Sequence, residues 1–223
     1  MNVSALPWND VDASIGSRIA ARLARSIVDG TIGPGELLTE ADAAALENAS
    51  RTPAREAMLQ LERWGLVRLL PKKGAIVTAP SPAERRDLLQ LRTTLEIAAL
   101  ERASTAPVAL QSLIETLGAA LEAQRRALAD TDSGAFADAD FAFHAAIIGA
   151  DGNGVVREVM RALGPRFARL THLALAERPA RAAVLLAEHD ELARLAGSPS
   201  AEFAAQLRRH VDEGHDEGAG HAW

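Results

Sequence analysis

The chain of 223 residues contains no cysteine and no tyrosine, and aromatic side chains make up only 4% of it. Without cysteine, disulfide bonds, thiolate zinc sites and cysteine nucleophiles are all excluded. The scarcity of aromatic residues argues against a sandwich or barrel of β-strands. The sequence also lacks an apolar run of about 18 residues and a signal-peptide pattern, so we expect a cytoplasmic protein that contacts no membrane.

The residues that are abundant favour helices. Hydrophobic residues account for 48% and charged residues for 24%, which is typical of folded globular proteins rather than disordered ones. Alanine fills roughly a fifth of the positions, and leucine, glutamate and arginine are plentiful, so we predict a mainly α fold. The net charge of −6 excludes a uniformly basic nucleic-acid binder but permits a local basic patch.

The charge divides the chain near residue 80. Residues 1–79 carry nine basic and nine acidic residues, whereas residues 80–223 carry fifteen and twenty-one. Between them, Pro80 and Pro82 are two positions apart and hold the backbone extended, which is typical of a linker. We therefore predict two domains, residues 1–79 and residues 80–223.

The order of elements in the first domain predicts a winged helix-turn-helix. The apolar spacing and turn signals indicate helices over residues 15–27, 40–46 and 51–64, then strands over 67–69 and 75–77 that form a hairpin. Asn48 lies where the chain must turn and tolerates a left-handed backbone conformation. Ser50 is a favourable N-cap for the third helix, which carries proline in its first turn.

The second domain is predicted to be helical throughout. Ser81 to Glu84 form a capping box with proline at the first helical position. Apolar residues at helical spacing then indicate six helices, through residues 88–98 and 110–121, over about 134–148, from about residue 155 onward, and over about 180–195 and 200–212. Gly164 and Pro165 should kink the fourth. Six helices of this length form a bundle.

Basic residues concentrate at the third helix and the hairpin. Six of them lie between residues 51 and 73, against two acidic residues, so this stretch carries a local charge of +4. Arg51 and Arg55 are one turn apart at the start of the helix, where a recognition helix meets base edges in the major groove. Exposed arginines can also be simple solvated charges, but the order of elements and the charge concentration together favour DNA binding.

Several strings then resemble a known family. Leu37–Asp42, Ser50–Ala57 and Leu61–Val67 resemble the GntR family of bacterial transcriptional regulators, and Leu91–Glu96 resembles the start of its FadR-type ligand domain, the FCD domain. The resemblance spans about residues 14–212 and implies a regulator that is not an enzyme. By this resemblance the DNA contacts come from Arg51, Thr52 and Arg55 and, at the wing tip, from Lys73 and Gly74. The chain departs from the family pattern at Glu47, Asn48 and Ala49, where Leu46 is a candidate to supply the missing core contact.

Four residues of the acidic half form a candidate metal site. Asp140 and His144 are four positions apart and so share one helix face. His189 and His210 lie on the last two helices, whose short connection makes them antiparallel and brings the two histidines to similar heights. Three imidazoles and one carboxylate suit Zn²⁺ or Ni²⁺. By spacing alone, a surface Asp–His pair and two unrelated histidines remain an alternative.

The resemblance implies that these residues do bind a metal. Metal-binding FadR-type domains carry an Asp-x-x-x-His pair on one helix and a histidine on each of the last two, and Asp140, His144, His189 and His210 match this pattern. Free coordination positions would then accept a small organic acid, a sugar acid or hydroxy acid being preferred. Arg92 could clamp the carboxylate of that acid, or else form an ion pair with Glu96. His172 has no matching partner and is interpreted as an ordinary histidine.

We therefore expect a DNA-binding repressor that is controlled by a small acid at a divalent metal ion. A homodimer would read a short palindromic operator. One alternative is a regulator with a purely structural metal. The other is an HD-type phosphohydrolase that uses His144, His189, Asp190 and Asp212 with two metals. The phosphohydrolase fits the sequence poorly, because Asp190 lies about 100° around its helix from His189.

Overall fold

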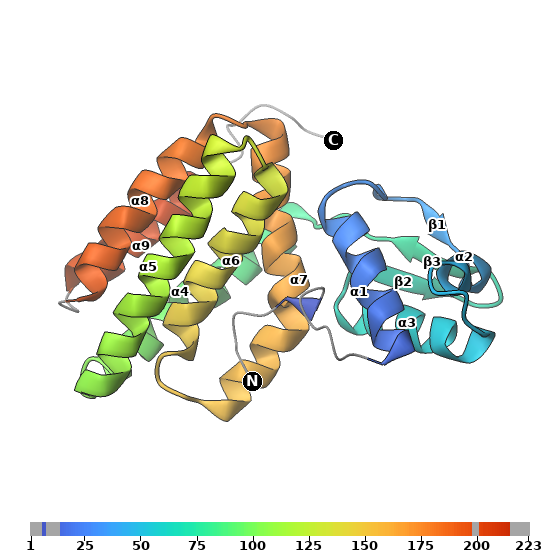
Figure 1. The fold of residues 1–223 in the computed structure, drawn as a ribbon, viewed down its shortest axis with the longest axis horizontal. Helices are drawn as coiled ribbons and strands as arrows, with labels where there is room; N and C mark the ends of the chain where they lie inside the picture. The colour runs from blue at the N-terminus through green and yellow to red at the C-terminus, as the bar shows by residue number, and fades with distance from the viewer. Residues whose placement is uncertain (1–5, 8–13, 198–200, 215–223) are drawn as a thin grey trace.

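A computed structural model describes residues 6–7, 14–197 and 201–214 and shows two units side by side (Figure 1). The first contains α1 (Ile15–Val28), β1 (Leu37–Leu38), α2 (Glu40–Ala45), α3 (Arg51–Arg63), β2 (Val67–Leu70) and β3 (Gly74–Val77). The second contains α4 (Pro82–Ala103), α5 (Pro107–Ala129), α6 (Ser133–Gly149), α7 (Gly154–Glu177), α8 (Arg181–Ala196) and α9 (Ala201–Gly214). The predicted winged helix-turn-helix and six-helix bundle are both confirmed.

Local chemistry sets the helices of the first unit. Ser14 caps α1 by accepting a hydrogen bond from the Ser17 backbone, and the apolar face of α1 packs on α3. Thr39 and Asp42 form a reciprocal capping box that begins α2. Asn48 turns the chain with φ of 49°, as predicted. Ser50 stands at the N-cap of α3 but makes no side-chain capping bond, which differs from the expectation.

The wing is a three-stranded sheet in the order β1-β3-β2 rather than a simple hairpin. Both pairings are antiparallel, with Val67 opposite Val77 and Leu38 opposite Ala75. The two residues of β1 are too few to show an alternating pattern, so this strand could not be predicted from the sequence. Gly74 has φ of 108°, and a Cβ atom there would overlap the Leu38 carbonyl, so β1 can pair with β3 only if this residue is glycine.

The bundle is built around α6, which is buried along most of its length and packs against α4, α5 and α7 (Figure 1). The α8–α9 pair closes the bundle against α5 and α4. Ser81 caps α4 by accepting from the Glu84 backbone, and α7 runs unbroken through Pro165. Among the described helices, none has the length and apolar character needed to cross a bilayer.

The two units touch through α1, α3, α6 and α7. Arg25 of α1 pairs with Asp138 of α6. Arg166 of α7 donates a hydrogen bond from Nε to the Trp64 carbonyl at 3.1 Å. Leu6 is only 2% exposed and packs beside Gly164 of α7. The first unit is therefore joined to the bundle by direct contacts as well as by the linker.

Candidate metal centre and nucleic-acid interface

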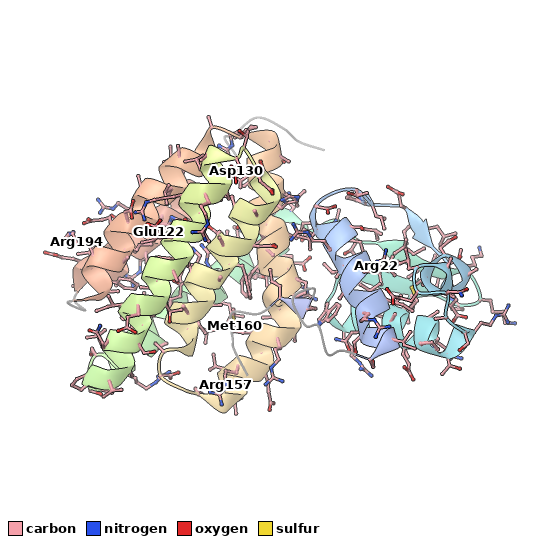
Figure 2. The ribbon with its side chains drawn as sticks, viewed as in Figure 1. Arg22, Glu122, Asp130, Arg157, Met160 and Arg194 are labelled. Carbon is pink, nitrogen blue, oxygen red and sulfur yellow. The ribbon has the colours of Figure 1, made fainter. Side chains whose placement is uncertain are left out.

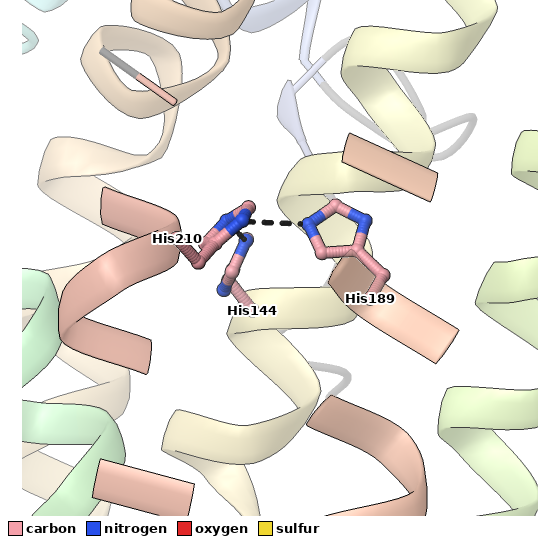
Figure 3. Close-up of side chains that lie close together, drawn as sticks. All are labelled: His144, His189 and His210. Atoms are coloured by element: carbon pink, nitrogen blue, oxygen red, sulfur yellow. Dashed lines mark hydrogen bonds between the residues drawn. The ribbon is translucent and has the colours of Figure 1, made fainter. Parts of the chain in front are cut away.

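Three histidines from three helices converge in the bundle interior (Figure 3). The Nε2 atom of His210 lies 3.3 Å from Nε2 of His144 and 3.3 Å from Nε2 of His189. Asp140 faces the same point, with Oδ1 at 3.5 Å from His189 Nε2 and 4.0 Å from His144 Nε2. The structure thus brings together all four predicted ligands, each of which is at most 3% exposed.

Each candidate ligand also contacts a second polar group, on the side that faces away from the cluster. The Nδ1 atoms of the histidines lie 2.7–2.9 Å from oxygen acceptors: His144 from Glu96, His189 from Gln124, and His210 from Glu188. Asp140 Oδ2 accepts a hydrogen bond from the Thr171 hydroxyl at 2.7 Å. Such partners fix the tautomer and orientation of a metal-binding ring.

These partners explain why the cluster fits a cation. With its hydrogen on Nδ1 and donated outward, a neutral imidazole has only a lone pair at Nε2. In this tautomer the lone pairs of His144 and His189 each lie 3.3 Å from that of His210, an arrangement that is unfavourable without a cation. Ligand atoms around an ion at 2.0–2.1 Å are themselves separated by roughly 3.0–3.4 Å. The donor set therefore fits one divalent ion of the zinc or nickel type.

Burial keeps the imidazoles of His144 and His189 neutral. Desolvation, helped by the nearby Arg92 charge and opposed by Asp140, lowers the pKa of His144 to about 3. Desolvation, followed by the neighbouring His144 and by Arg92, holds the pKa of His189 well below its usual value. Neutral imidazole is the form that binds a metal, so the ligands are ready near neutral pH.

Arg92 lies next to this cluster and pairs with Glu96, with 3.4 Å between Nε and Oε1. The Arg92–Glu96 contact expected as an alternative for Arg92 is therefore present. Much of the guanidinium is left unused, because Arg92 is 3% exposed and its Nε and Nη2 have no hydrogen-bond partner among the residues that the structure describes. Burial raises the pKa of Glu96 to about 8, against the opposing effect of Arg92.

Sequence reasoning missed the groups behind the ligands. Glu96, Gln124 and Thr171 lie 48, 65 and 31 positions from the ligands they contact, on other helices, so no local pattern reveals them. Only Glu188, which directly precedes His189, stood near a predicted ligand in the sequence. His172 is not part of the cluster found among the described residues, in agreement with its interpretation as an ordinary histidine.

The predicted DNA-reading side chains lie on the surface. Arg51, Thr52 and Arg55 are all exposed on the first turns of α3, and Lys73 is exposed at the tip of the wing. Gly74 is only partly exposed, and its contact with β1 gives it a structural role in the wing.

Glu47, which departs from the family pattern, has its own function in the fold. It accepts hydrogen bonds from Arg18 at 3.1 Å and Arg22 at 2.9 Å, both on α1 (Arg22 is labelled in Figure 2). These arginines, Arg22 first, lower the pKa of Glu47. Leu46 is partly buried against the core, as expected. Ion pairing to α1 and the Leu46 contact thus replace the usual apolar packing at this turn.

The phosphohydrolase arrangement does not form. Asp190 is 46% exposed and pairs with Arg125 on α5, outside the histidine cluster. Asp212 is exposed on α9. Neither carboxylate joins His144 and His189, so the set of ligands that an HD-type site needs is not assembled.

A winged helix with an exposed basic recognition helix, joined to a helical bundle with an interior site, defines a two-domain DNA-binding regulator. Residues 15–77 match the gntR family of bacterial regulatory proteins, and residues 87–213 match the FCD domain. The chain belongs to the GntR family of transcriptional regulators that carry an FCD domain. This family assignment implies DNA binding by the first domain and binding of a small effector by the second, and regulators of this kind are not an enzyme class.

Individual relatives agree with this assignment. An HTH-type transcriptional regulator from the TAR-I ttuE-ttuC' intergenic region of Agrobacterium vitis is 39% identical over 117 residues, which cover 52% of this chain and 68% of that protein. The gluconate operon transcriptional repressor of Bacillus subtilis is 30% identical over 153 residues, which cover 69% of this chain and 62% of that protein. A GntR regulator structure from Rhodococcus sp. RHA1 is 24% identical, covers 94% of this chain and 100% of its own, and superposes with a TM-score of 0.76, which supports the fold.

Proposed function

We propose that this protein is a repressor whose operator binding is controlled by a small carboxylic acid held at a divalent metal ion in the FCD domain. The observation that carries the proposal is the cluster of three Nε2 atoms, together with the outer oxygen atoms that face the Nδ1 atoms of the same rings. Asp140, His144, His189 and His210 would hold the ion, which supplies a Lewis-acidic centre for an oxygen ligand.

Arg92 is the proposed partner of the acid. Its guanidinium is buried beside the cluster and retains donors that no group in the described part of the chain accepts from. A carboxylate bound to the ion and to Arg92 would satisfy these donors through charge-assisted hydrogen bonds. A sugar acid or hydroxy acid is our preferred class, and the name of the gluconate operon repressor among the relatives is in keeping with it.

The proposed DNA contacts are Arg51, Thr52 and Arg55 in the major groove and Lys73 on the phosphates, with Gly74 shaping the wing tip. We propose that the domains divide at residues 79 and 80, within the connection between β3 and α4. In a homodimer, the two DNA-binding domains would each contact one half of a short palindromic operator.

We propose the α4–α9 face as the surface that joins the two copies. A groove of about 940 Å³ lies there, lined by apolar side chains and by charges of both signs, among them Arg86, Arg208, Glu101 and Asp212. Charges of both signs on one surface suit a two-fold interface, because each arginine of one copy can meet a carboxylate of the other. Light scattering tests this: a monomer that still binds DNA specifically would contradict the dimer.

The functional test combines metal, acid and DNA. Operator fragments selected in vitro from random duplexes would be titrated with metal-loaded protein, with and without gluconate and other sugar or hydroxy acids, and binding followed by fluorescence anisotropy. We expect one acid to weaken operator binding of wild type but not of Arg92→Ala. A metal-loaded protein that binds DNA but responds to no acid, in this assay or in a thermal-shift screen, would support the alternative of a purely structural metal.

A further inference from the structure

Helix α7 contacts the recognition helix directly. Arg166 donates from Nε to the carbonyl of Trp64, the residue that caps the C-terminus of α3. The carbonyl groups at a helix C-terminus lack intrahelical donors and carry the negative end of the helix dipole, so a guanidinium there is favourable. Arg166 thus caps the DNA-reading helix from the effector domain.

The neighbouring residues are shaped for this contact. Gly65 has φ of 67°, and a Cβ atom added to it would overlap the Arg166 guanidinium. On its other side, Arg166 Nη1 lies 3.6 Å from Glu84 Oε1 in the first turn of α4. One side chain therefore connects the bundle helix α7, the end of α3 and the start of α4 after the linker.

The same helix reaches the candidate metal centre. Thr171 lies five residues after Arg166, a rise of roughly 7.5 Å along the helix, and its hydroxyl holds Asp140 Oδ2. Between them, Phe167, Ala168 and Leu170 are buried, so this part of α7 is packed as a rigid element. A parallel connection exists on α6, where Asp138 pairs with Arg25 of α1 two residues before Asp140.

We propose that Arg166 is the positioning residue through which occupancy of the metal centre restrains the recognition helix. This inference rests on the proposed metal site. Asp140 would hold the ion through Oδ1, and its Oδ2 accepts the hydrogen bond from Thr171, so its carboxylate would be fixed from both sides. The α6–α7 pair then becomes less mobile, and the Arg166–Trp64 bond carries that restraint to the C-terminal end of α3. The route to the DNA-binding domain is thus a side-chain contact, in addition to the linker near Pro80.

Hydrogen exchange on the full chain tests the proposal, with Zn²⁺ as the probe. We expect zinc to slow exchange of the backbone amides of residues 61–66 by about 5-fold or more in wild type, the lower end of typical coupling between sites. Arg166→Ala should bind zinc with unchanged stoichiometry and affinity, and zinc should no longer slow exchange at residues 61–66. The matched control is Arg161→Ala, an exposed arginine one and a half turns earlier on α7, which should behave as wild type.

Gly65→Ala provides a second variant that breaks the contact from the opposite side, since the added Cβ displaces the Arg166 guanidinium without changing α7. It should lose the zinc effect at residues 61–66 as Arg166→Ala does. Zinc-dependent protection that persists in both variants would overturn the proposal. Zinc uptake by wild type without any protection of α3 would overturn the coupling alone, whereas no zinc uptake would overturn the metal centre itself and the coupling with it.

Discussion

Gln124→Leu offers a sharp test of how the bundle holds its histidines. Gln124 is fully buried on α5, and its Oε1 atom accepts from His189 Nδ1 at 2.8 Å while its Nε2 donates to the Ala139 carbonyl at 3.4 Å. Leucine is similar in size but removes both bonds. The imidazole loses the partner that fixes its hydrogen on Nδ1, so its lone pair is no longer directed reliably toward the other ligands.

The expected magnitude follows from these two bonds. Loss of an outer partner typically lowers metal affinity about 10–100-fold, or roughly 1.4–2.8 kcal/mol. In the metal-free protein the unsatisfied His189 N–H should cost about 1–3 kcal/mol of unfolding free energy. The Ala139 carbonyl can still accept a hydrogen bond within α6, so loss of the bond from Gln124 should add little to this destabilisation.

Two measurements separate these effects. Competition with a chromophoric chelator gives the zinc affinity, and urea denaturation of metal-free protein gives the unfolding free energy. The control is Gln111→Leu on the same helix, where the glutamine is exposed and bonds only Glu115 among the contacts seen. If Gln124→Leu bound zinc as tightly as wild type, the argument that outer acceptors orient the histidines would be refuted.

Further predictions concern DNA, backbone and pH. Arg51→Ala or Arg55→Ala should each cost about 1–3 kcal/mol of specific binding, whereas Lys73→Ala should weaken all sequences evenly and flatten the salt dependence of binding; unchanged footprints in both arginine variants would contradict this. Gly65→Ala should lower the melting temperature, because alanine at positive φ costs roughly 1–2 kcal/mol. In metal-free protein Glu96, with a pKa of about 8, binds a proton only when folded, so stability should rise as pH falls from 8 to 6.5. Below pH 6.5, His144 and His189 take up protons in the unfolded chain but not in the folded one, which lowers the unfolding free energy as pH falls. The proton held by folded Glu96 offsets one of these two, so the unfolding free energy should fall by about 1.4 kcal/mol per pH unit. The unfolding free energy measured by urea denaturation should therefore be highest near pH 6.5. In Glu96→Gln, the decrease of the unfolding free energy between pH 6.5 and 8 should be absent.

The sequence predicted the fold well because the signals for it are local. Helical spacing of apolar residues, capping residues and the linker prolines all act within a few positions. The errors occurred where the cause is distant. Strand β1 is two residues long and exists because Gly74, far along the chain, permits its approach.

At the candidate site, too, features with a local sequence signal could be predicted, and features that depend on distant residues could not. The four candidate ligands could be chosen from the sequence because Asp140 and His144 are one turn apart and the family resemblance implies the other two. The acceptors behind them could not be found, because Glu96 and Gln124 reach their histidines from other helices. The ion pairs of Glu47 could not be predicted either, because its partners Arg18 and Arg22 become neighbours only after α1 folds onto the turn.

The metal content of the purified protein tests the central claim most directly. Wild type and the single variants Asp140→Ala, His144→Ala, His189→Ala and His210→Ala would be purified gently without chelator, titrated with Zn²⁺ and Ni²⁺, and analysed for bound metal, with His172→Ala as control. We expect one ion per chain in wild type and in His172→Ala, and loss of the ion in each of the four ligand variants. Wild-type protein that carries no stoichiometric ion and takes up none on titration would contradict the account.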